Sequence, residues 1–292
     1  MADAKKRKGR VLRILGYAVV ALAAYVVSVV WFFPYPELSR RVERRARAQG
    51  IALEIKDLGP GWLPGLLARR VRAARLDHPD AAVEVEEVRL RLVPVRWLRG
   101  ERTLRVQGRT FGGAVDVRFT PGDRSTVQAA WDRLDLARLP VHSALAELPL
   151  AGRASGTLDL QLESRRVEQL TGRLAATFTD LKIEAGTVQG FPVPPVSLGD
   201  GLARAVSRDG KVDVQTLKFQ GGDLEVDFKG NILLRNDLSR SLISGLLSLR
   251  PDEKAAKELG LLFAMFPSSR SSDGRYTAKI RGSLTRPRLS KR

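Results

Sequence analysis

Alternation of apolar and polar residues dominates the chain from residue 51 onward and predicts β-strands. Ile51, Leu53 and Ile55 alternate with small or charged residues, which is typical of a strand with one buried face. Similar alternation marks residues 70–76, 82–93, 103–107, 114–120, 127–136, 156–163, 170–178, 181–184, 212–219, 223–234 and 276–284. Glycine pairs at Gly112–Gly113 and Gly221–Gly222 favour hairpins. We therefore expect a mainly antiparallel β domain.

The apolar phase changes once within the strand predicted at residues 82–93. Val83 and Val85 share one phase, whereas Val88 and Leu90 share the other. A slip of one residue would turn the apolar side chains to the opposite face of a sheet. We therefore expect a β-bulge at Glu86–Glu87.

A few helices are expected beside the strands. Residues 38–49 form a basic, partly amphipathic segment that stops at Gly50. Residues 140–148 and 238–249 carry apolar residues at helical spacing. Pro251, Asp252 and Glu253 suit the first turn of a helix that extends to about residue 266. Residues 191–195 hold three prolines and predict a rigid extended segment.

These elements predict an elongated, curved and open antiparallel sheet with one apolar face and a few short helices. Two such sheets packed back to back, or a closed barrel, are the alternatives. The strand at residues 223–234 would extend about 36 Å, which is long for a compact globule. The β-rich domain covers residues 51–292 and could divide into halves at 51–150 and 151–292.

An uncharged run at residues 14–33 predicts a single transmembrane helix, since it is long enough to span the hydrocarbon of a bilayer. A cleaved signal peptide is the alternative, because residues 21–23 resemble a cleavage site. Apolar residues continue past that site, which favours an uncleaved anchor. The predicted anchor residues include Ile14, Leu15, Val19, Leu22, Val26, Val30, Trp31 and Phe33.

Cationic residues in the tail at residues 1–13 predict the orientation of this helix. They are Lys5, Lys6, Arg7, Lys8, Arg10 and Arg13. Segments rich in Lys and Arg tend to stay cytoplasmic. We therefore expect residues 34–50 to be a juxtamembrane linker helix and residues 51–292 to lie in the periplasm. The protein would be a single-pass protein of a bacterial inner membrane.

Composition narrows the classes of partner. The net charge of +18 suits anionic lipid headgroups or an acidic protein. The charges are scattered along strands and no RNA-binding aromatic signature is present, so nucleic acid is not an expected partner. The chain has no cysteine, which excludes disulfides and thiolate chemistry.

The polar residues form no recognisable catalytic, cofactor or metal motif. Zinc sites usually need three or more protein ligands, and the two histidines, His78 and His142, are far apart in sequence. Glu84, Glu86 and Glu87 lie along a strand among arginines, so we expect cross-strand ion pairs. We therefore expect a protein without enzymatic activity.

Four segments near the end of the chain carry a family resemblance. They are LLSLRP at 246–251, LLFAMFP at 261–267, DGRYT at 273–277 and IRGSLTRP at 280–287. They resemble the closing region of the type II secretion system protein N (GspN) family, as does the layout of one anchor and a β-rich domain. The motif positions are Pro267, Asp273, Gly274, Tyr276, Gly282 and Pro287.

This resemblance implies an inner-membrane accessory or assembly component of the type II secretion system. It would act through periplasmic contacts with other secretion-system proteins. The chain is also similar, more distantly, to AsmA-like proteins, whose anchored β-grooves handle lipids. That similarity implies the alternative function of binding or transferring phospholipid on an apolar sheet face.

Overall fold

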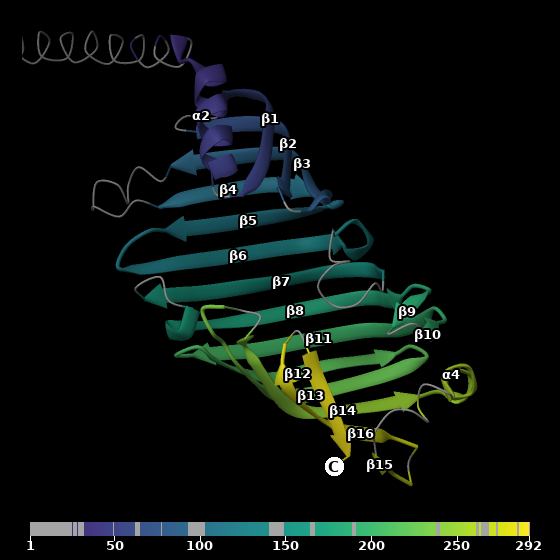
Figure 1. The fold of residues 1–292 in the computed structure, drawn as a ribbon. Coiled ribbons are helices and arrows are strands. Elements are labelled where there is room, and N and C mark those ends of the chain that lie inside the picture. The colour runs from purple at the N-terminus through teal and green to yellow at the C-terminus, as the bar shows by residue number, and fades with distance from the viewer. Residues whose placement is uncertain are drawn as a thin grey trace, which may run out of the picture.

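One long antiparallel sheet forms most of the protein in the computed structural model (Figure 1). The structure describes residues 25, 28, 32–48, 50–61, 65–76, 78–92, 103–139, 149–163, 167–188, 191–237, 240–260, 263, 269–272, 274–284 and 286–291. Fourteen of its fifteen strands follow the order β1-β2-β3-β4-β5-β6-β7-β8-β11-β12-β13-β14-β16-β15, and the fifteenth, β17, pairs with β16. Nearly every strand therefore pairs with its neighbours in the sequence, and the expectation of an open antiparallel sheet is confirmed.

The elements of the first half are α2 (Tyr35–Ala48), β1 (Ile51–Pro60), β2 (Gly65–Arg75), β3 (His78–Leu92), β4 (Leu104–Thr110), β5 (Gly113–Thr120), β6 (Arg124–Asp135) and the 3-10 turn η1 (Leu136–Arg138). The second half holds β7 (Leu150–Glu163), η2 (Val167–Gln169), β8 (Leu170–Ile183), β9 (Gly186–Val188), β10 (Phe191–Val193), β11 (Val196–Arg208), β12 (Lys211–Gly221), β13 (Leu224–Leu233), β14 (Leu242–Pro251), α4 (Glu253–Glu258), β15 (Ser269–Arg270), β16 (Tyr276–Ser283) and β17 (Arg286–Lys291). The small β9–β10 hairpin forms a separate sheet.

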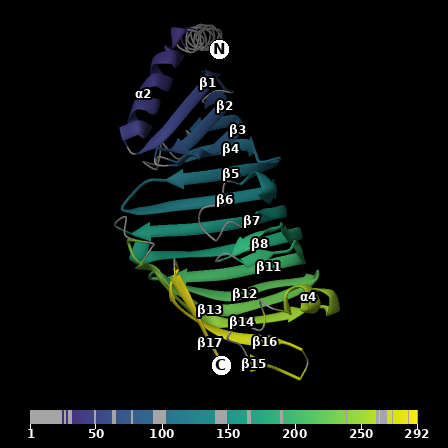
Figure 2. The same ribbon diagram turned by 45° about the vertical axis from the view of Figure 1, so that its right-hand side comes forward.

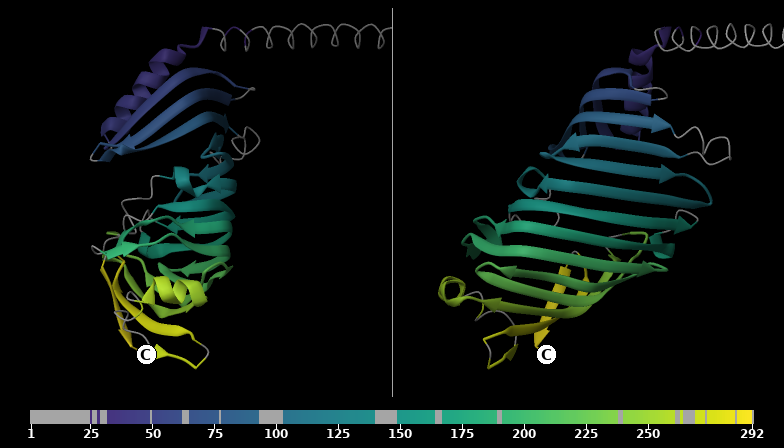
Figure 3. Two further views of the ribbon diagram at one scale, coloured as in Figure 1. Left: turned by 90° about the vertical axis from the view of Figure 1, so that its right-hand side faces the viewer. Right: turned by 180° about the vertical axis from the view of Figure 1, so that it is seen from behind.

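The strands lie across the long axis of the molecule, one after another from β1 at one end to β16 and β17 at the other (Figure 2). The sheet twists and curves along this axis, so that the last strands run in a different direction from β5–β8 (Figure 3). Helix α2 lies beside β1 at the N-terminal end, and α4 lies at the C-terminal end.

Aligned bulges keep the apolar residues of β1, β2 and β3 on one side. The pairing of β3 with β4 skips Glu86, which confirms the predicted bulge. The pairing of β1 with β2 skips Asp57 and Arg70, which have φ angles of 54° and 55°. Asp57 and Arg70 form an ion pair of 2.8 Å. Because three neighbouring strands each carry an extra residue at the same place, their alternation changes in step.

A second line of irregularities crosses β6, β7, β8 and β11. Positive φ angles occur there at Arg133, Gly152, Asp180 and Gly199. A bulge leaves backbone groups without a strand partner. Side chains supply some of these partners, because the N–H of Arg133 donates to Ser155 Oγ at 2.8 Å and the N–H of Asp180 donates to Asp200 Oδ1 at 3.2 Å. Residues 170–178 and 181–184, predicted as two strands, are joined through this bulge into β8.

The main buried cluster lies at the C-terminal end of the sheet. It joins Leu181, Phe219 and Leu224 to Leu259 and Phe263, and the ring of Phe263 stacks on Tyr276 with centroids 4.6 Å apart. The carboxylate of Asp252 accepts a hydrogen bond from the N–H of Ala255 and caps α4. A helix therefore starts at Glu253 as expected, whereas Pro251, expected in its first turn, is the last residue of β14.

The prediction of a helix at residues 238–249 is wrong, because residues 242–251 form strand β14. Ile243 and Leu247 face Ile232 and Phe228 of β13, whereas Leu242 is 47% exposed on the other side. The leucines fit both a helical and a two-residue period, and pairing with two neighbouring strands decides between them.

Two further strands differ from the sequence interpretation. Strand β11 was not predicted, since Gly199, Asp200 and Gly201 interrupt its apolar pattern. The last strand is predicted at residues 276–284, and Pro287 follows it. Pro287 instead lies within β17 and pairs with Gly282 of β16. The helix predicted at residues 140–148 lies outside the described residues.

Nearly all of the predicted membrane helix also lies outside the described residues, which include only Tyr25, Ser28, Phe32 and Phe33 of it. Within the described part of the chain, no helix has the length and apolar character needed to cross a bilayer.

We predict that Gly201→Ala destabilises the sheet. A Cβ atom at this position would lie 2.2 Å from Cδ1 of Phe219, whose ring is buried and packs against Phe178 with centroids 5.4 Å apart. The ring cannot move without disturbing the buried cluster, so the expected loss in unfolding free energy is about 1–3 kcal/mol. Thermal or urea unfolding measures it. Gly59→Ala is the matched control, since its Cβ would meet no atom within 4 Å. Equal stability of the two variants would contradict the prediction.

Candidate functional site: the apolar face of the sheet

One side of the sheet carries an unbroken row of residues without polar side chains from β1 to β17. Direct cross-strand partners in an antiparallel sheet point to the same side. Their register gives the row Pro60, Leu66, Leu90, Val106, Val117, Ala129, Leu158, Leu174, Ala205, Val214, Gly230, Gly245, Ile280 and Leu289. Neighbouring strands lie about 4.8 Å apart, so the row extends roughly 60 Å. We call this side the apolar face.

The opposite side, the polar face, is charged along the adjacent row. From β3 to β17 this row reads Arg91, Arg105, Arg118, Gln128, Asp159, Arg173, Val206, Asp213, Asn231, Ser244, Arg281 and Arg288. The sheet therefore has one apolar side, as the alternation predicts, and an arginine-rich opposite side.

The middle of the apolar face lacks a complete covering in the described structure. Between β3 and β8, Val117 and Leu158 are only half-buried and Phe119 is 39% exposed. The buried apolar residues there are the small Ala154 and Ala176, together with Leu181 of β8, which belongs to the cluster at the C-terminal end. Of the two described α-helices, α2 contacts β1 and α4 contacts β14, so both lie at the ends. Large apolar side chains therefore remain partly open to solvent along the centre.

Aromatic rings lie over glycines on the apolar face. A Cβ built on Gly156 would lie 2.5 Å from Cζ2 of Trp131, and the ring of Phe228 occupies the space above Gly230 and Gly245 in the same way. The rings thus cover the glycines of the neighbouring strands. Each ring fills space that a glycine leaves open, which lowers the relief of the face at these positions.

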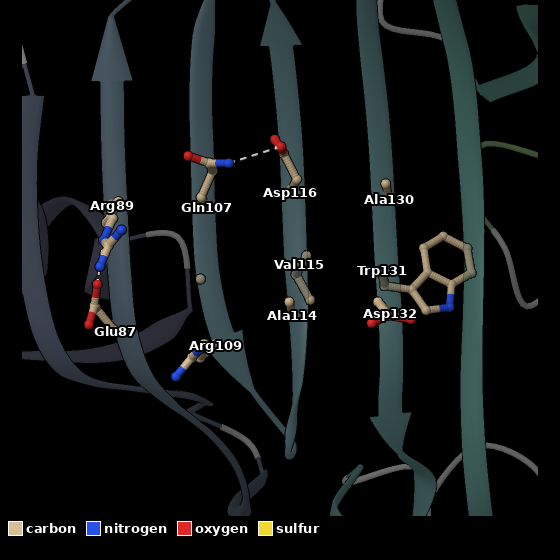
Figure 4. Close-up of a pocket in the computed structure, with 11 residues that line it drawn as sticks. Glu87, Arg89, Gln107, Arg109, Ala114, Val115, Asp116, Ala130, Trp131 and Asp132 are labelled. Atoms are coloured by element: carbon tan, nitrogen blue, oxygen red, sulfur yellow. Dashed lines mark hydrogen bonds and ion pairs between the residues drawn. The ribbon is translucent and has the colours of Figure 1, made fainter.

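The polar face has a shallow hollow of about 550 Å³ between β3 and β6 (Figure 4). Gln107 and Asp116 face each other in it, and Glu87 pairs with Arg89. Asp116 accepts hydrogen bonds from Arg105 Nε at 3.0 Å and Gln107 Nε2 at 3.1 Å. The guanidinium of Arg105 lowers the pKa of Asp116 below its ordinary value of 3.8, and Asp116 raises the pKa of Arg105.

The three glutamates of β3 behave differently from one another. Glu84 lies 3.8 Å from Arg72 of β2, which confirms the predicted cross-strand pair. Glu87 pairs with Arg89 in its own strand, and Glu86 has no ion pair with the described part of the chain. Among the described residues, no set of three His, Cys, Asp or Glu side chains could hold a metal ion.

The residues singled out in the sequence are only partly described. Of the predicted anchor and topology residues, Phe33 alone is described, and it is 40% exposed. Of the closing motif, Pro267 and Asp273 lie outside the described residues. Gly274 adopts a φ of 78° in a turn, Tyr276 packs on Phe263, and Gly282 pairs with Pro287. These motif residues complete the last strands and the buried cluster.

Sequence reasoning missed the Arg105–Asp116–Gln107 network and the aromatic–glycine contacts. A signal for the second was present, because Gly156, Gly201 and Gly230 fall in the apolar phase of their strands. Comparisons with protein-family models, with curated proteins and with solved structures found no match.

We predict that Asp116→Asn lowers stability in a pH-dependent way. A carboxylate whose folded pKa is depressed contributes stability above its unfolded pKa, and that contribution is lost as the pH falls through the folded value. The variant should therefore be less stable by about 1 kcal/mol near neutral pH. The difference from the parent protein should shrink as the pH falls below 3.8. Urea unfolding across pH measures this, and a constant difference at all pH values would contradict the pairing.

Proposed function

We propose that the apolar face binds the acyl chains of phospholipid and that the protein is a lipid-binding or lipid-transfer protein. The observation that carries this proposal is the continuous apolar row whose large side chains are half-buried between β3 and β8. Soluble monomers rarely leave contiguous apolar patches larger than a few hundred Å² open to water. An occupant of apolar chemistry would complete this sheet.

Acyl chains suit this surface better than a rigid partner does. Each methylene group transferred from water to an apolar surface contributes about 0.8 kcal/mol. A long chain collects many such contributions on a surface of low relief, without needing hydrogen-bond partners. The row of roughly 60 Å is longer than one acyl chain, so several lipids could lie along it. The expected membrane anchor would keep the sheet close to a supply of lipid.

Site-specific photocrosslinking tests this proposal. We expect a photoreactive amino acid at Leu158 to capture phospholipid in cells, with mass spectrometry identifying the adduct. The matched control is the adjacent Asp159, which is on the same strand but faces the polar side. Phospholipid adducts should form severalfold more at 158 than at 159.

Equal labelling at the two positions would contradict a face-specific lipid site. Absence of lipid adducts at 158, at Leu174 and at Val117 would contradict lipid binding altogether. The substitution Leu158→Asp should reduce adduct formation at 174, since it places a charge beside the acyl chain.

A second candidate function is the assembly component of the type II secretion system that the GspN resemblance implies. The observation that favours it is the polar face between β3 and β8, where Arg91, Arg105, Arg118 and Arg173 share a row with one carboxylate, Asp159. Such a surface would steer an acidic protein toward it.

Crosslinking from the polar face tests this second function. A photoreactive residue at Thr157 or Thr177, both exposed on that face, should capture secretion-system proteins in a strain with an intact system. The same residue at Leu158 should capture fewer proteins. Capture of no secretion component from the polar face would count against the assembly role.

A further inference from the structure

Helix α2 is fixed to the sheet through one side only. Its partly buried residues are Tyr35, Leu38, Ser39, Glu43 and Ala46, which lie on one side at helical spacing. The carboxylate Oε1 of Glu43 accepts a hydrogen bond from the N–H of Ile55 at 2.9 Å. That N–H lies on the outer edge of β1, so α2 both covers and holds the first strand.

The other side of α2 is basic. Arg40, Arg41, Arg44, Arg45 and Arg47 are all exposed, and none of them forms an ion pair with a described residue. The carboxylate on this side is Glu37, in the first turn, where the helix dipole favours a negative charge. Unpaired like charges crowded on one helix repel one another. An external anionic surface would relieve that repulsion.

Aromatic residues extend this surface toward the N-terminus. Phe32 is 85% exposed and Phe33 is 40% exposed, and the ring of Phe33 lies 5.0 Å from that of Tyr35. Aromatic rings are enriched at the level of lipid headgroups, and basic helices with aromatic neighbours lie on anionic bilayers. An acidic protein would satisfy the arginines but gives no reason for two exposed phenylalanines beside them.

We propose that the arginine side of α2 docks on the headgroups of anionic phospholipids. Arginine guanidinium groups bind phosphate through paired hydrogen bonds. The bond between Glu43 and Ile55 then places the β1 end of the sheet against the bilayer. This docking does not depend on the apolar face binding lipid, because it uses a separate surface and a charge interaction.

A fluorescent reporter on α2 tests this docking in the full-length chain. The chain has no cysteine, so Ala48→Cys provides one labelling site, exposed on the arginine side. The emission of a polarity-sensitive dye attached at position 48 is measured in nanodiscs of phosphatidylcholine and in nanodiscs that also contain phosphatidylglycerol. We expect emission typical of a headgroup environment in the anionic discs, with reversal by salt. The same dye at Gln128→Cys, on the polar face of β6, should not respond.

Charge-removing variants separate a local effect from the overall charge. Replacing Arg40, Arg41 and Arg44 by Gln should weaken docking roughly hundredfold, since each cation near an anionic surface contributes about fivefold. In this variant α2 should dissociate from the anionic bilayer at a much lower salt concentration. The matched control replaces Arg118, Arg173 and Arg204 by Gln, which removes the same charge from the polar face and should leave docking unchanged.

Three outcomes would overturn the proposal. They are an identical dye response in neutral and anionic discs, retention of docking by the α2 variant, and equal loss in both triple variants. Lipid crosslinking at Leu158 tests lipid binding by the apolar face independently. Failure of the dye assay with lipid adducts intact would reject the docking alone, and the reverse result would reject the lipid-binding face alone.

Discussion

Every strand of this sheet must keep its apolar residues on the same side as those of its neighbours. A slip of one residue in any strand would turn that strand's apolar side chains toward solvent. The aligned extra residues Asp57, Arg70 and Glu86 show how the chain meets this constraint, because three strands change phase together. The apolar row, the arginine-rich face and the covered ends all depend on this shared alternation.

Much of the fold could be predicted because the alternation is local. The bulge at Glu86, the hairpin around Gly112–Gly113 and the start of α4 at Asp252 each follow from a few neighbouring residues. Strand β11 could not be predicted in this way, since Gly199 and Gly201 lack the side chains that mark a strand. Its position depends on β8 and β12, which pair with it on either side. Strand β14 was misread for a related reason, because its leucines also fit a helix.

The candidate site was predictable as a face and not as a set of contacts. Apolar alternation indicated a one-sided sheet without an evident second layer. The network of Arg105, Gln107 and Asp116 requires the register of β4 against β5, and Trp131 reaches Gly156 only through the pairing of β6 with β7. Contacts between residues on different strands depend on register, which a single sequence expresses weakly. The two ends of the face also differ: α4 and Phe263 bury one end, whereas α2 lies at the edge of the other.

The order of the strands has a consequence for how such a protein changes in length. Almost every strand contacts only the strands before and after it in the chain, as in a repeat protein whose units interact with nearest neighbours. Insertion or deletion of one hairpin preserves the direction and the sidedness of all remaining strands. Each such event would lengthen or shorten the sheet by about 10 Å. The length of the sheet can therefore change during evolution in steps of two strands, while the apolar face and the polar face keep their character.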